Sequence, residues 1–272
     1  MQNDNQAVGM VDQLDSIDAG PTEAELVYAM ASLAAGPLDP AALALATDPA
    51  GIAARAERAN VRRARDWAQL CQYRDANAAL AGSPVRAVFM GDSITELWAL
   101  ADPDLFRGGI VGRGISGQTS PQMLVRFMAD VVAAKPLLVH LLCGTNDIAG
   151  NTGPSTPQDY KNNVQAMVAL ARANGIGVII GSIPPSHNIG WASDQGLDPR
   201  MRIGELNAWL RDFANGHGLV WADYHAVLRV ADDRMNPEFT RDGVHPTRAG
   251  YRAMRQVAQD ALAQALGHSS LQ

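Results

Sequence analysis

Two short segments, far apart in the chain, carry side chains that together can cleave an ester. VFMGDSITELW at 88–98 places Ser93 just after an apolar run, and DGVHP at 242–246 supplies Asp242 and His245. A hydroxyl is a poor nucleophile until an imidazole accepts its proton, and the imidazole needs a carboxylate that fixes its tautomer and stabilises its charged form. The residue types therefore predict serine esterase chemistry.

Two further loops strengthen this interpretation. A serine that follows a strand is more often a helix cap than a nucleophile, so Ser93 alone is a weak signal. GRGISGQ at 112–118 and GTND at 144–147 follow two other predicted strands, and such loops meet at the carboxyl edge of an open α/β sheet, where ligands bind. We therefore expect Gly114 and Asn146 to lie near Ser93.

Taken together, the motifs resemble the four blocks of the GDSL-type, or SGNH, hydrolase family, and they come in the family's order. The blocks are Gly91-Asp92-Ser93, Gly114, Gly144-Thr145-Asn146-Asp147 and Asp242-Gly243-Val244-His245-Pro246. The resemblance covers roughly 85–265. Its first block reads GDSI rather than GDSL, a conservative exchange at an apolar position.

The resemblance implies a role for each motif residue. Ser93 is the expected nucleophile, His245 the general base and then acid, and Asp242 the orienting carboxylate. The expected oxyanion hole consists of the backbone N–H groups of Ser93 and Gly114 and the side-chain amide of Asn146. These roles agree with the chemistry, because a tetrahedral intermediate needs fixed donors and glycine lets the backbone approach closely.

Other catalytic or cofactor interpretations fit less well. GRGISG also satisfies the dinucleotide pattern G-x-G-x-x-G, but it follows the second predicted strand, and Leu141, Leu142 and Cys143 stand where a ribose-binding acid is expected. The G-x-S-x-G elbow of ordinary α/β-hydrolases is absent. Cys143 ends an apolar strand, which favours a packing role over that of a nucleophile.

No cofactor or metal is predicted. Cys71 and Cys143 form no metal-ligand spacing and no disulfide framework. The histidines outside the motifs are scattered, and we interpret them as structural or exposed: His140, His187, His217, His225 and His268. Asp92 and Asp147 are expected to support their loops.

Short apolar runs alternate with helical patterns from residue 85 onward, which indicates a doubly wound α/β domain. Five strands are expected, at 85–90, 109–112, 137–142, 176–182 and 219–222, with helices near 119–134, 157–173, 199–215 and 247–265. The family resemblance implies a flavodoxin-like, three-layer α/β/α fold whose parallel sheet has the order 2-1-3-4-5.

Residues 1–82 are expected to form a helical N-terminal extension, and 83–272 the hydrolase domain. Residues 1–20 are polar and aperiodic, which is typical of a mobile tail. Thr22 with Glu25 has the spacing of a capping box, and Asp39-Pro40 places a cap before a first-turn proline. Residues 52–80 read as one docked helix that ends at Gly82.

Composition excludes several classes of protein. The 272 residues are 47% hydrophobic and 18% charged, which favours a globular protein with a sizeable core. No segment approaches the roughly 20 apolar residues of a membrane span. The net charge is −6 with no basic cluster beyond Arg62, Arg63 and Arg65, which argues against nucleic acid or anionic membranes as partners.

MQNDNQAVGM lacks the features of a secretory signal, so a cytoplasmic location is the default; a removed leader would make it periplasmic or secreted. The oligomeric state is not predicted.

The sequence predicts a small ester substrate. Overall likeness to small acylhydrolases of the family suggests short acyl groups, with O-acetyl esters of carbohydrates first and lysophospholipase or acyl-thioesterase activity as alternatives. An alternative hypothesis, from a different functional class, is a non-catalytic ligand-binding module of the same fold. The segment 182–199 borders the expected site and offers little apolar surface. Its Trp191 either faces the substrate or anchors the loop.

Overall fold

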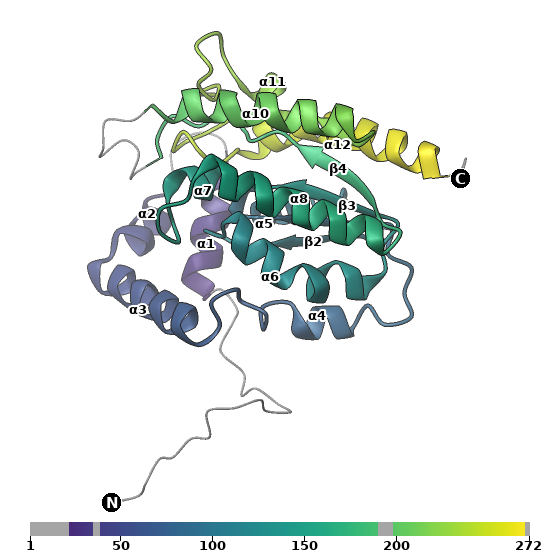
Figure 1. The fold of residues 1–272 in the computed structure, drawn as a ribbon. Helices are drawn as coiled ribbons and strands as arrows, with labels where there is room; N and C mark the ends of the chain where they lie inside the picture. Colours follow the sequence, from purple (N-terminus) through teal and green to yellow (C-terminus); the bar gives the residue numbers. More distant parts are fainter. Residues whose placement is uncertain (1–21, 35–38, 190–197, 270–272) are drawn as a thin grey trace, which may run out of the picture.

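The computed structural model describes residues 22–34, 39–189 and 198–269, and it has five parallel strands in one sheet. The strands are β1 (Ala87–Gly91), β2 (Ile110–Gly114), β3 (Leu138–Leu142), β4 (Gly177–Gly181) and β5 (Val220–Ala222). Their order is β2-β1-β3-β4-β5. Helices cover both faces of the sheet (Figure 1), so the expected three-layer α/β fold and strand order are confirmed.

Successive residues of the strands alternate between two apolar layers. Val88 and Met90 of β1 contribute to the layer that packs under α6 (Ser120–Asp130), α8 (Pro157–Ala173) and α10 (Pro199–Gly216). Ala87 and Phe89 contribute to the layer on the opposite face, under α5 (Ser93–Ala101) and α12 (Arg248–Ser269). Because both faces are covered, the strands read as continuous apolar runs rather than as alternating ones.

The helices of this region agree with the expected pattern and add three short ones. They are α5 (Ser93–Ala101), α6 (Ser120–Asp130), α7 (Thr145–Ala149), α8 (Pro157–Ala173), α10 (Pro199–Gly216), α11 (Tyr224–Leu228) and α12 (Arg248–Ser269), with a 3₁₀ turn at Val132–Ala134. α8 begins at a capping box in which the Thr156 hydroxyl accepts the Asp159 N–H. α5, α7 and α11 are the helices that the sequence did not predict.

The N-terminal extension is helical, as expected. Its helices are α1 (Glu23–Ser32), α2 (Pro40–Thr47), α3 (Pro49–Arg65) and α4 (Arg74–Ala78). The capping box of Thr22 and Glu25 is present at α1, and Asp39 caps α2. The predicted tail at 1–20 lies outside the described residues. The division at residue 82 stays a prediction, and Leu33 of the extension is buried within the core under α5 and α12.

The single helix expected at 52–80 is wrong. α3 ends at Arg65, and irregular chain leads to α4. The Asp66 carboxylate accepts the backbone N–H groups of Leu70 at 2.8 Å and Cys71 at 2.9 Å, and Gln69 takes a left-handed φ of 56°. Aspartate competes for backbone donors in this way and favours turns over helix interiors. Residues 66–73 therefore do not continue α3.

Across the three described ranges, no helix is both long and apolar enough to span a bilayer.

Candidate active site

Ser93 lies where β1 turns into α5. It is the first residue of that helix, and the Asp92 carboxylate caps the helix by accepting the Ile94 N–H at 2.9 Å. Gly91 before it has no room for a side chain, because an added Cβ would lie 2.0 Å from the Thr95 hydroxyl. The tight turn places the Ser93 hydroxyl at the carboxyl edge of the sheet.

The chain fold brings the three predicted catalytic residues into contact. The Ser93 Oγ lies 2.9 Å from Nε2 of His245, and Nδ1 of His245 lies 2.6 Å from the Asp242 carboxylate. A carboxylate can only accept, so Nδ1 carries the proton and Nε2 is left to accept the serine proton. The second Asp242 oxygen accepts the backbone N–H groups of Val244 at 2.9 Å and His245 at 2.8 Å.

Electrostatics favour a charged Asp242 beside His245. Burial alone would raise the pKa of the Asp242 carboxyl, but its hydrogen bonds from His245 and Val244 and the charge of His245 hold the pKa far below its usual value. Burial alone would lower the pKa of His245, yet the hydrogen bond and charge of Asp242, with the charge of Asp92, raise it above 6.5. Burial raises the pKa of Asp92 to about 6.

Gly114 and Asn146, which together with Ser93 form the predicted oxyanion hole, border the same turn. An added Cβ on Gly114 would lie 2.2 Å from the Glu96 nitrogen, so this position requires glycine. The Asn146 amide donates to the Gln118 carbonyl at 3.0 Å and to Asp92 at 3.3 Å, and its oxygen accepts from Asn151 at 2.7 Å. These contacts fix the orientation of the amide.

Buried polar contacts hold the motif loops. As expected, Asp147 supports its loop: it accepts the Ser120 N–H and hydroxyl, the latter at 2.5 Å. Glu96 accepts the Ser116 N–H at 2.8 Å. Arg126, which the sequence reasoning missed, is fully buried and donates to the carbonyls of Gly91 at 3.0 Å and Arg113 at 2.8 Å.

Arg126 also bonds to residues outside the strands, namely Gln118 at 2.5 Å and Asp130 at 2.9 Å. Its guanidinium therefore ties the ends of β1 and β2 to α6. The available sequence signal was a pair of opposite charges at i and i+4 beside the apolar Met123 and Phe127.

The irregular segment 66–73 also contacts this region. The Tyr73 hydroxyl donates to the carbonyl of Gly114, and Gln118 donates to the carbonyl of Ala68 at 2.8 Å. Arg113 lies over the Tyr73 ring, 4.8 Å from its centre. Sequence reasoning placed Tyr73 on a helix and assigned it no contact with the motif loops.

His140 and Cys143, which the sequence suggested as structural residues, both lie buried in the core. His140 is buried, bonds to the Tyr224 hydroxyl at 2.7 Å and stacks on Phe89; burial lowers its pKa to about 3. Burial raises the pKa of the Cys143 thiol well above its usual value, as expected for a packing residue. Trp191 lies outside the described residues. Within the described ranges, no three His, Cys, Asp or Glu side chains cluster as a metal site would require.

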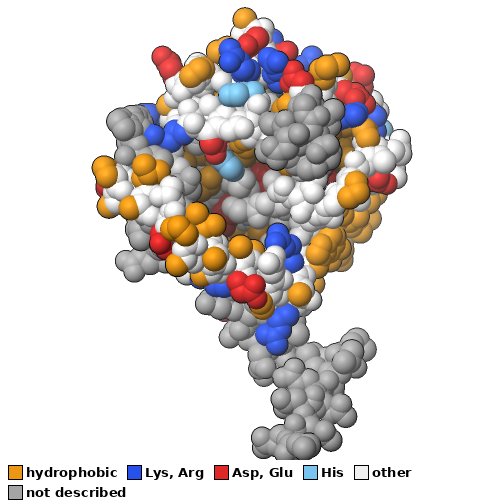
Figure 2. All heavy atoms as spheres, turned by 90° about the vertical axis from the view of Figure 1, so that its left-hand side faces the viewer, with side chains coloured by type: hydrophobic (Ala, Val, Ile, Leu, Met, Phe, Trp, Pro, Cys, Tyr) orange, Lys and Arg blue, Asp and Glu red, His pale blue; other side chains and the backbone are white. Residues whose placement is uncertain are grey.

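Figure 2 faces the carboxyl edge of the sheet and shows it hollowed near the centre, with acidic and histidine side chains at the rim. The Asp242 and His245 side chains are 51% and 34% exposed, so a substrate can approach them from solvent. A cavity of about 840 Å³ between the starts of α8 and α10 borders the same edge at Asp147. Neither Ser93 nor His245 lines it.

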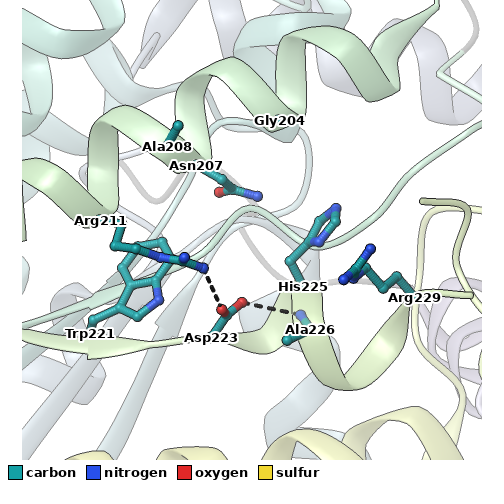
Figure 3. Close-up of a pocket in the computed structure, with 9 residues that line it drawn as sticks. All are labelled: Gly204, Asn207, Ala208, Arg211, Trp221, Asp223, His225, Ala226 and Arg229. Carbon is teal, nitrogen blue, oxygen red and sulfur yellow. Dashed lines mark hydrogen bonds and ion pairs between the residues drawn. The ribbon is translucent and has the colours of Figure 1, made fainter. Parts of the chain in front are cut away.

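A smaller pocket of about 280 Å³ lies between α10, β5 and α11 (Figure 3). Three of its polar side chains, Arg211, Asp223 and Asn207, hold the surrounding elements together. Arg211 pairs with Asp223 at 2.9 Å, Asp223 caps α11 through the Ala226 N–H, and the Asn207 amide bonds to both backbone groups of Ile183. None of the predicted site residues lines this pocket.

Comparison with known proteins points to one family. The model of the GDSL-like lipase/acylhydrolase family matches residues 89–253. No curated protein matches the sequence.

Solved structures share the fold over most of their length. A protein from Bacteroides fragilis assigned as an acylhydrolase is 41% identical, covers 74% of this chain and 99% of its own, and has a TM-score of 0.71. A GDSL-like lipase from Bacteroides thetaiotaomicron is 39% identical over 74% of this chain and 100% of its own, with a TM-score of 0.70. An acetylxylan esterase from Geobacillus stearothermophilus is 20% identical, covers 66% and 95%, and has a TM-score of 0.55; at that identity the likeness concerns the fold.

Proposed function

This chain belongs to the GDSL-like lipase/acylhydrolase family, and from that premise we propose that it hydrolyses short-chain carboxylic esters through an acyl-enzyme on Ser93. The observation that carries the proposal is the continuous hydrogen-bonded chain from Ser93 through His245 to Asp242, at 2.9 and 2.6 Å. A module that only bound a ligand would have no need of this arrangement.

In the proposed reaction, the Ser93 oxygen attacks the ester carbonyl while Nε2 of His245 takes the hydroxyl proton. Asp242 keeps the imidazole in the required tautomer and stabilises its positive charge. The backbone N–H groups of Ser93 and Gly114 and the Asn146 amide stabilise the oxyanion. His245 then protonates the departing alcohol oxygen, which leaves an acyl group on Ser93.

Water completes the cycle. His245 removes a proton from a water molecule, which attacks the acyl carbonyl, and the second tetrahedral intermediate collapses with return of the proton to Ser93. The products are a carboxylic acid and free enzyme.

An ester panel tests the proposal. We expect the protein to hydrolyse p-nitrophenyl acetate and to be labelled stoichiometrically by a fluorophosphonate. We also expect it to deacetylate acetylated sugars, the substrate class that we propose first. Binding of these compounds without turnover or labelling would instead support a non-catalytic module.

Acyl-chain length gives a second expected result. Each buried methylene can contribute about 0.8 kcal/mol, so an enzyme with a long acyl channel shows kcat/KM rising steadily with chain length. Ile183 and Ile189, which follow β4 near the site, are buried in the protein and so contribute no exposed apolar surface to such a channel. We expect acetyl to butyryl esters to be preferred over octanoyl esters. A rise through decanoyl, measured below micelle-forming concentrations, would favour a lipase or lysophospholipase.

Replacing Asn146 with alanine should lower kcat by about 10²–10³, or about 2.7–4 kcal/mol, because one oxyanion donor typically contributes that much. KM should change far less. Asn174→Ala is the matched control, since that exposed amide bonds to the Leu170 carbonyl of its own helix at 2.8 Å, away from the motif loops. Near-normal kcat in Asn146→Ala would show that this amide does not touch the transition state.

A further inference from the structure

Arg241, the residue just before Asp242, is bound to the end of helix α1. Its Nε donates to the Ala34 carbonyl at 3.0 Å, and its Nη2 donates to the same oxygen. Ala34 and Arg241 are 207 residues apart in sequence. Ala34 lies two residues beyond the last residue of α1, and a guanidinium suits its carbonyl because a charged donor makes a stronger hydrogen bond than a neutral one.

A second contact joins the same two parts of the chain. The backbone N–H of Arg248, which begins α12, donates to the carbonyl of Leu33 at 3.0 Å. An N–H at the start of one helix and a carbonyl at the end of another each lack a partner within their own helix, so this hydrogen bond supplies both. The segment between Arg241 and Arg248, which contains the proposed acid and base, is therefore attached at both ends to Leu33 and Ala34, the two residues that follow α1.

α1 can act as a fixed support because its end is anchored in the core. Leu33 is only 1% exposed and belongs to the apolar cluster that includes Ile94 of α5 and Tyr251 of α12. Displacing Leu33 would open a destabilising cavity in that core. The position of the Leu33 and Ala34 carbonyls is thus set by packing.

The loop is held more weakly on its other side. The His187 N–H donates to the carbonyl of Gly243 at 3.2 Å, and the Asn188 side chain donates to that of Asp242 at 3.1 Å. These are neutral hydrogen bonds, whereas the two bonds from Arg241 are charge-assisted and roughly twice as strong.

We propose that Arg241 is a positioning residue that holds the Asp242–His245 loop against α1, so that the N-terminal extension completes the active site. The inference rests on the proposed function, because the loop matters only if His245 acts as the base for Ser93. It gives residues 22–34 an indirect part in catalysis, because their hydrogen bonds reach the loop through Arg241 and Arg248.

Arg241→Met tests the proposal, since methionine keeps much of the aliphatic volume and removes the donors. We expect kcat to fall by about 10- to 100-fold with KM unchanged, because a small misplacement of a catalytic group is enough for such a loss. Arg241→Lys retains one charged donor and should recover part of the rate. Arg252→Met is the control, because that exposed side chain bonds only to its own helix, at the Arg248 carbonyl.

A double-mutant cycle separates positioning from general stabilisation. If Arg241 acts through His245, then Arg241→Met should cause no further loss in a His245→Ala background. An equal loss in both backgrounds, or a normal kcat in Arg241→Met, would overturn the proposal. Thermal unfolding of each variant shows whether it is folded, and Arg241→Lys carries the test if the methionine variant is not.

A measurement without substrate keeps this inference distinct from the proposed function. The Nδ1 proton of His245 lies in a 2.6 Å bond to Asp242 and should give a downfield proton NMR signal. We expect the signal to broaden or disappear in Arg241→Met and to persist in Arg252→Met. If the wild-type protein hydrolysed no ester, the proposed function would fail, and an unchanged signal in Arg241→Met would overturn the positioning role independently.

Discussion

Replacing Ser93 with alanine should abolish acyl-enzyme formation and lower kcat by a factor on the order of 10⁶, the scale found when a triad serine is removed. The hydroxyl is the atom that bonds to the substrate, and its structural contact is the 2.9 Å bond to His245. The fold should survive, because the cap of α5 comes from Asp92 rather than from Ser93. The variant should therefore unfold at a temperature close to that of the wild type.

Fluorophosphonate labelling followed by intact-mass measurement gives the readout. The wild-type protein should gain one label per chain, and Ser93→Ala should gain none. Ser155→Ala is a suitable control, because that exposed hydroxyl bonds only to a neighbouring carbonyl at 3.5 Å. Stoichiometric labelling that persists in Ser93→Ala would place the nucleophile elsewhere and refute the assignment.

Local sequence signals predicted those elements whose boundaries are set locally. α8 runs over Pro157–Ala173, as expected, because Thr156 caps it and Pro157 fits its first turn. The strands were found because a parallel sheet with both faces covered needs continuous apolar runs. The break after Arg65 was missed, since it depends on one carboxylate, Asp66, binding backbone groups that a helix would otherwise use.

In the candidate active site, too, the sequence predicted local features but not contacts between distant residues. Motif residues could be named from spacing, because a nucleophile, a base and an acid are recognisable by chemical type. Their supports could not be named, since contacts such as Tyr73 to Gly114 and Arg241 to Ala34 join residues 41 and 207 positions apart. Only the fold brings those pairs together, and a single sequence carries no record of the pairing.

Replacing Asp242 with asparagine should lower kcat by about 10⁴, because the variant selects the wrong imidazole tautomer. One Asp242 oxygen accepts two backbone N–H groups, so the asparagine oxygen should keep that place. Its NH₂ group would then face Nδ1 of His245. Nδ1 must accept from it, the ring proton moves to Nε2, and Nε2 can no longer take the proton of Ser93.

The same variant should shift the pH profile of kcat/KM. His245 acts as a base only when neutral, so activity falls as the pH drops through its pKa, which Asp242 raises above 6.5 in the wild type. Without the hydrogen bond and charge of Asp242, burial dominates and the pKa decreases. The residual activity of Asp242→Asn should therefore lose its acid limb at a lower pH than the wild type. Asp104→Asn, which alters an exposed pair with Arg107, should leave both kcat and the profile unchanged. An Asp242→Asn enzyme that kept most of its activity between about pH 6 and 9, with the acid limb unmoved, would mean that Asp242 does not orient His245.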